Sequence, residues 1–138
     1  MRMLLPLSVL AGALALSACV DDTPPVDPNK QLRNLDGHEI WEVCHWAREY
    51  AGGDTAAFSC PDDDLTDNDF GDAIYIPPTV GECGQTLAGF QDTDCVLNVG
   101  DYRRLVEDSS TDPCTPQTVE DSAGCSITRA YSQSGGNN

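Results

Sequence analysis

The sequence is poor in lysine and contains no long apolar run after its first residues. Lys30 is the only lysine among 138 residues, and 7 basic residues face 23 acidic ones, which gives a formal net charge of −16. Nucleic-acid binding depends on Lys and Arg that neutralise phosphates, so this balance excludes nucleic acid as a natural partner. A run of about 18 apolar residues, the length that a spanning helix needs, does not occur after residue 19.

The common catalytic motifs are also absent. The only histidines are His38 and His45, and neither H-E-x-x-H, G-x-S-x-G nor a phosphate-binding glycine loop occurs. A pair of carboxylates suited to glycoside hydrolysis is not excluded by residue type, but a small domain offers little room for a cleft. We therefore expect a protein that is not an enzyme.

The first nineteen residues have the form of an export signal. A short basic start is followed by a 13-residue apolar stretch, Leu4 to Leu16, which is too short to span a bilayer and suits a signal peptide. The stretch ends in Leu16-Ser17-Ala18-Cys19, which resembles the lipobox of bacterial lipoproteins. An ordinary secretory signal, in which Cys19 is incidental, is the alternative.

The lipobox resemblance implies that residues 1–18 are removed and that Cys19 carries a diacylglyceryl group and an N-acyl chain such as palmitate. The chain would then be anchored in the cell envelope by its lipid. In enteric lipoproteins an Asp directly after the Cys favours the inner membrane, and Val20 stands there instead. The resemblance thus points to the outer membrane, with a periplasmic or surface-exposed domain.

Composition divides the rest of the chain into three parts. Residues 19–33 are rich in Pro and Asp without apolar periodicity, and we expect them to form an extended, solvated tether after the lipidated Cys19. Residues 34–131 contain the apolar patterns and form an acidic, disulfide-rich domain. Residues 132–138 hold only Ser, Gly, Gln and Asn, and we expect a loose tail.

Six cysteines remain after Cys19, and an even number in an exported chain predicts three disulfides with 15 possible pairings. They are Cys44, Cys60, Cys83, Cys95, Cys114 and Cys125. Their spacings of 16, 23, 12, 19 and 11 include no close pair, which disfavours zinc. Sequential pairing, 44–60, 83–95 and 114–125, ties each helix to its following loop and is our expectation; the other pairings stay open.

Helical patterns dominate the domain. Asp36 and Glu39 predict a capped helix that Gly52-Gly53 ends. Its inward face is Ile40, Val43, Cys44, Ala47, Tyr50 and Ala51.

Residues 79–95 align without gaps on residues 98–114, and each copy starts with a cap residue and an acid three positions later. The inward positions are Val80, Cys83, Leu87 and Phe90 in one copy, and Val99, Tyr102, Leu105 and Val106 in the other. Residues 118–125 are interpreted as a third, shorter copy. Ile74 to Ile76 is the clear extended segment, with 95–97 as a possible partner.

The predicted fold class is therefore mostly α: a small disulfide-stapled array of three to four short helices with long acidic loops. This layout resembles the small, cysteine-rich, mostly helical lipoproteins of Gram-negative bacteria whose function is unknown. The resemblance covers only the pattern of residues 79–125 and implies no catalytic residues.

The first candidate site is the acidic segment 61–72, where six of twelve residues are Asp. Carboxylates of Asp62, Asp64, Asp67 and Asp69 are of the type that binds Ca²⁺. The EF-hand pattern fails, because Asp67 stands where Gly is needed and Ala73 where Glu is needed. A solvated acidic loop without a ligand is the alternative, and we otherwise expect no cofactor.

The second candidate is Trp41, which lies on one side of the first helix with His45 and Arg48, off the core stripe. Its ring could stack on a sugar or on a partner peptide. The alternatives are that Arg48 covers it by a cation–π contact or that it belongs to a second packed layer. The leading hypothesis is a lipid-anchored envelope protein with a structural or interaction role and a basic protein surface as its partner. Calcium binding and carbohydrate binding are the competing hypotheses.

Overall fold

The computed structural model describes residues 21–60, 73–129 and 132–134. Along the chain the elements are the 3₁₀ turn η1 (Leu32–Asn34), α1 (Gly37–Tyr50), the 3₁₀ turn η2 (Gly53–Thr55), β1 (Phe58–Cys60), β2 (Ala73–Ile76), α2 (Val80–Ala88), α3 (Val99–Thr111), β3 (Gln117–Glu120), β4 (Ser126–Arg129) and β5 (Ser132–Ser134). None of the helices in these ranges is long and apolar enough to cross a membrane.

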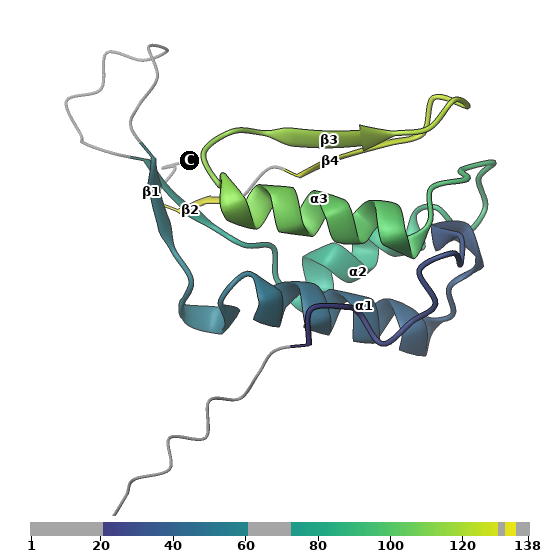
Figure 1. The fold of residues 1–138 in the computed structure, drawn as a ribbon, viewed down its shortest axis with the longest axis horizontal. Coiled ribbons are helices and arrows are strands. Elements are labelled where there is room, and N and C mark those ends of the chain that lie inside the picture. The colour runs from purple at the N-terminus through teal and green to yellow at the C-terminus, as the bar shows by residue number, and fades with distance from the viewer. Residues whose placement is uncertain (1–20, 61–72, 130–131, 135–138) are drawn as a thin grey trace, which may run out of the picture.

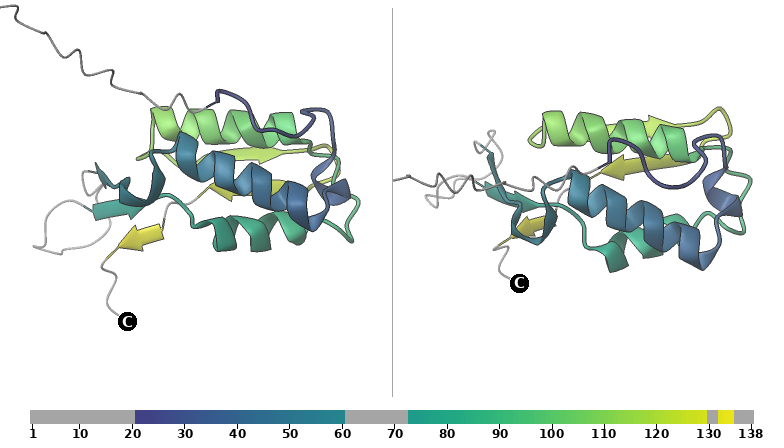
Figure 2. Two further views of the ribbon diagram at one scale, coloured as in Figure 1. Left: turned by 90° about the horizontal axis from the view of Figure 1, so that it is seen from below. Right: turned by 60° about the horizontal axis from the view of Figure 1, so that its bottom comes forward.

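The helix α1 and the β3–β4 hairpin lie on opposite sides of the domain, with α2 and α3 between them (Figure 1). The sheet of β1, β2 and β5 forms at one end of this arrangement (Figure 2). The described chain begins beside α1, where the Asp21 carbonyl accepts from Trp46, and then runs to the start of α3, where the carbonyls of Pro28 and Lys30 accept from Gly100 and Val99 (Figure 2).

All three long helices begin with a capping box, as the sequence predicts. The side chains of Asp36, Thr79 and Asn98 each accept a hydrogen bond from the backbone N–H three residues later, and the acid at that position bonds back. The end of α1 is confirmed as well, because Gly52 follows it with φ of 108°, a conformation that favours glycine. Local hydrogen bonds therefore fix where each helix starts and where α1 stops.

The core forms where the inward faces of the helices meet. Leu87, Val99 and Val106 are completely buried, together with Val43 on α1. The hydroxyl of Tyr102 lies 3.1 Å from Cys83 Sγ, so the two equivalent positions of the internal repeat meet in the core. The predicted inward faces of all three helices are confirmed, with Tyr50, Val80 and Phe90 only partly buried.

Three disulfides are confirmed, but the sequential pairing is wrong. The bonds join Cys44 to Cys83, Cys60 to Cys114 and Cys95 to Cys125. Cys44 and Cys83 are core positions of α1 and α2, which pack side by side, so each faces the other helix and not its own following loop. Each bond therefore connects segments that are at least 30 residues apart.

The fold is a small disulfide-stapled domain as predicted, but it is mixed α/β, which corrects the expectation of a mostly α array. Ala73–Ile76 is a strand as predicted, but it pairs with β1 and β5 and not with residues 95–97. The expected third helical copy at 118–125 is an antiparallel hairpin of β3 and β4. Val119 and Ile127 pair across it and pack against the helical core, and Gly124, with φ of 84°, lies in its turn.

The expected tether is part of the folded domain from residue 21 onward. Val26 and Leu32 are buried, and Gln31 forms an isolated antiparallel bridge with Asn98. Proline suits this segment because it follows an irregular path along the helices, in which the Pro28 carbonyl accepts from Gly100 N–H at 2.8 Å. Likewise Ser132–Ser134 of the expected tail forms β5.

Candidate functional site

Trp41 and its neighbours on α1 form the most exposed apolar feature in the described part of the chain. The start of α1 is held by Lys30, whose Nζ lies 2.6 Å from Glu39 Oε1. This hydrogen bond lowers the pKa of Glu39, and the backbone N–H of Glu39 lowers the pKa of Asp36. The first turn is therefore fixed, and it sets the direction of the side chains that follow.

His38, Trp41 and His45, which we call the Trp41 surface, form a row of aromatic rings. The ring centroids of His38 and Trp41 are 6.4 Å apart with planes at 6°, and those of Trp41 and His45 are 4.9 Å apart at 25°. The two histidines lie about one helical turn before and after Trp41, which places both imidazoles beside the indole on the surface of α1. Trp41 nevertheless remains 53% exposed, so much of its side chain is open to solvent.

A shallow hollow of about 260 Å³ lies beside the Trp41 surface. Its wall is built by the N-terminal segment and by α1: Asp21, Thr23, Pro25, Trp41, Glu42, His45, Trp46 and Glu49. Trp46, which is buried, donates from its indole N–H to the Asp21 carbonyl at 2.8 Å. This bond fixes the beginning of the described chain against the helix.

Arg48 does not cover Trp41, so the cation–π alternative is wrong. Its guanidinium donates to the carbonyls of Pro77 and Pro78 and lies 3.3 Å from Asp54 Oδ1. These bonds direct the side chain to the segment before α2 and connect α1 to it. Of the predicted trio, only Trp41 and His45 are brought together.

A larger hollow of about 550 Å³ lies between α3 and β3, on the side of the domain away from α1. Its rim is mostly polar and acidic and includes Asp101, Asp108 and Glu120, with Arg104 paired to Asp101. Val96, the other large apolar side chain that stays exposed among the described residues, lies at its edge.

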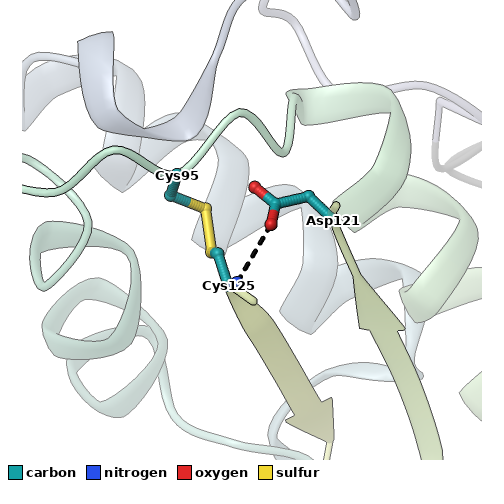
Figure 3. A group of neighbouring side chains, drawn as sticks. All are labelled: Cys95, Asp121 and Cys125. Atoms are coloured by element: carbon teal, nitrogen blue, oxygen red, sulfur yellow. Dashed lines mark hydrogen bonds between the residues drawn. A yellow bond between two sulfur atoms is a disulfide. The ribbon is translucent and has the colours of Figure 1, made fainter. Parts of the chain in front are cut away.

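In the described part of the chain, Cys95, Asp121 and Cys125 are the one group with the spacing of metal ligands (Figure 3). The two sulfurs are bonded to each other, and a disulfide sulfur is not the thiolate that binds metals. The carboxylate of Asp121 accepts from the backbone N–H groups of Val96, Ala123 and Cys125 at 2.8–2.9 Å. The bond from Val96 is the main cause that lowers the pKa of Asp121, so this group fits a structural role.

The predicted calcium ligands Asp62, Asp64, Asp67 and Asp69 lie outside the described residues. Two other residues were missed at the sequence level. Trp46 falls off the predicted core stripe because the segment that buries it was expected to be solvent-exposed. Asp121 begins the turn Asp-Ser-Ala-Gly, a pattern typical of a tight turn, but its partner Val96 is 25 residues away and had no local signal.

Comparisons of the chain with protein-family models, with curated proteins and with solved structures find no match.

Proposed function

We propose that this chain is a lipid-anchored protein of the bacterial cell envelope with a structural or binding role and no catalytic one. The observation that carries the proposal is the set of three disulfides, which accounts for all six cysteines after Cys19. Such bonds form and persist in oxidising compartments outside the cytosol. Among exported proteins, the lipobox-like sequence at residues 16–19 favours anchoring by a lipid on Cys19.

The acyl chains implied by that sequence suffice for stable attachment. Each buried methylene contributes about 0.8 kcal/mol, and one chain binds only marginally while two or more hold firmly. The folded domain would then act at the membrane surface. Its large excess of acidic side chains suits a protein partner with a basic surface, because complementary charge raises the association rate and the specificity.

The test is expression of the full chain in a Gram-negative bacterium, followed by mass spectrometry of the mature N-terminus and membrane fractionation. We expect a mature chain that starts at Cys19 with its acyl chains, in the membrane fraction. The Cys19→Ala variant should lack acylation and leave the membrane. A mature chain that starts at another residue without lipid would contradict the proposal.

Calcium binding by the segment 61–72 is tested separately, by the melting temperature of residues 20–138 in Ca²⁺ and in EDTA at matched ionic strength. A ligand that binds only the folded state at a hundredfold excess over its Kd stabilises it by about 2.7 kcal/mol. A rise with Ca²⁺ that disappears when Asp62, Asp64, Asp67 and Asp69 are changed to Asn would support this second role.

Carbohydrate binding through Trp41 is favoured by the exposure of its ring. Sugars stack on aromatic faces, and the imidazoles of His38 and His45 lie close to the indole and compete with a sugar for that space. Titration of the domain with glycan fragments, with Trp41→Ala as the matched variant, tests it directly.

A further inference from the structure

The place where the described chain begins limits where a lipid on Cys19 can lie. Asp21 is fixed on α1 by the hydrogen bond from Trp46, and it shares the wall of the hollow with Trp41. Only Val20 separates it from Cys19. Consecutive Cα atoms are about 3.8 Å apart, so two steps of chain reach about 7.6 Å at most.

This distance removes the free tether that the composition suggested. Given lipidation of Cys19, on which this inference depends, the domain is held close to the bilayer, because the headgroup region is itself only about 5–8 Å thick on each side. The part of the domain next to the anchor is the outer side of α1, and the hairpin β3–β4 lies on the opposite side (Figure 1).

The chemistry of this side fits the headgroup region of a bilayer. Tryptophan is enriched at membrane interfaces, where its apolar body and its N–H group meet different surroundings. Trp41 is 53% exposed, and two acids lie near the histidines beside it: His38 Nε2 is 3.3 Å from Glu42 Oε1, and His45 Nδ1 is 3.6 Å from Glu49 Oε1. These acids suit a zwitterionic surface with ammonium groups better than an anionic one.

We propose that the Trp41 surface is seated among the phospholipid headgroups of the membrane that carries the lipid on Cys19. A contact that is too weak to hold a free protein is populated here, because the short connection gives it a high effective concentration. This contact with the headgroups fixes the orientation of the domain, so that the hollow between α3 and β3 faces away from the membrane and toward a partner.

The experiment uses the full lipidated chain, grown with 5-fluorotryptophan and reconstituted in vesicles of phosphatidylcholine and phosphatidylethanolamine that carry a headgroup nitroxide. The Trp41→Phe variant assigns the ¹⁹F resonance of Trp41. The matched control is Thr128→Trp in the Trp41→Phe background, which places the same probe at an exposed position on β4. Paramagnetic broadening falls steeply with distance, so we expect strong broadening of the Trp41 resonance and much weaker broadening of the control.

Each outcome bears on the proposal. Equal or weaker broadening of Trp41 than of the Thr128→Trp probe, on a chain whose acylation mass spectrometry has verified, overturns this inference and leaves the lipid anchor standing. A purified chain without acylation overturns both. A Trp41 resonance that responds to soluble glycan fragments but not to the nitroxide lipid contradicts contact with the membrane and favours carbohydrate binding.

Discussion

The carboxylate of Asp121 collects three backbone N–H groups from two separate segments of the chain. Ala123 and Cys125 belong to its own turn, and Val96 belongs to the loop before α3. One side chain therefore joins the hairpin to that loop, beside the Cys95–Cys125 disulfide. Because these hydrogen bonds favour the ionised carboxyl, its pKa is lowered from the ordinary value of 3.8 in the folded state.

We predict that Asp121→Asn lowers the melting temperature at pH 7. An amide offers one acceptor oxygen where the carboxylate offers two, so Val96 N–H would face an NH₂ group. The pKa of Asp121 is lower in the folded state, so its contribution to stability is present above 3.8 and is lost as the pH falls through the folded value. The difference between the two proteins should therefore shrink below pH 3.8 in thermal unfolding followed by circular dichroism.

Asp94→Asn is the control for that comparison. It removes the same charge from a strongly acidic protein, and Asp94 is exposed in the loop close to Cys95. If both variants melt at the same temperature across the pH range, the lost charge alone explains the change in stability, and the three hydrogen bonds of Asp121 add nothing to it.

Among single residues, contacts within one helical turn were predictable from the sequence, and contacts between distant segments were not. The capping pairs Asp36–Glu39, Thr79–Glu82 and Asn98–Asp101 were predictable because both partners lie within one helical turn. The burial of Trp46 was not, because it depends on Asp21, 25 residues earlier in a segment without apolar periodicity. Trp41 was identified as a candidate because it lies off the core stripe. Of its two predicted neighbours, His45 does lie beside it, whereas Arg48 binds the carbonyls before α2.

At the scale of elements, the sequence predicts that a segment is a strand, but it does not predict which strands pair with it. The sequence Ile74-Tyr75-Ile76 before two prolines indicates an extended segment, and that is local information. Its pairing with β1 and β5 joins residues that are far apart, and several short polar segments could have served equally well. The repeat also suggested a helix at 118–125, where alternation of inward residues and a glycine turn favour a hairpin.

The disulfides are the strongest links between elements, and they should not contribute equally. Closing a loop of this size contributes about 4 kcal/mol through the entropy of the unfolded chain. We predict that the double variant Cys60→Ser/Cys114→Ser loses about that amount or somewhat more in urea unfolding, because Cys114 is exposed and only the Cys60 half of the bond is buried.

The double variant Cys44→Ala/Cys83→Ala is the matched comparison. Both of its sulfurs are buried between α1 and α2, so a cavity adds to the lost cross-link and the free energy of unfolding should fall further. A smaller loss for this pair than for Cys60 and Cys114 would show that the core bond is dispensable for packing.

At the scale of the whole molecule, the domain is larger than its apolar pattern suggests, because residues 21–33 complete its core. We predict that a chain starting at Asn34 is much less stable than one starting at Asp21. Burial of an aliphatic side chain contributes about 1.5–3 kcal/mol, so the loss of Val26 and Leu32 together costs about 3–6 kcal/mol. Loss of the Lys30–Glu39 ion pair adds to it.

Thermal unfolding of three chains, starting at residues 21, 26 and 34, checks this prediction. The second keeps both buried side chains but lacks the Asp21–Trp46 hydrogen bond, so it should melt between the other two. Equal melting temperatures for the first and third chains would restore the view of this segment as a tether.

The disulfide connectivity also has a consequence for how the chain is made. Cys60 lies inside the loop closed by Cys44–Cys83 but pairs beyond it, and Cys95 lies inside the next loop and again pairs beyond it. As synthesis proceeds from the N-terminus, an oxidant that joined cysteines in order of appearance would form 44–60, 83–95 and 114–125, none of which is native. Native pairing therefore requires that each cysteine stays reduced until its own partner has emerged, or that early bonds are reshuffled by thiol–disulfide exchange. The yield of this protein should thus depend on the isomerase of its compartment more than on the oxidase.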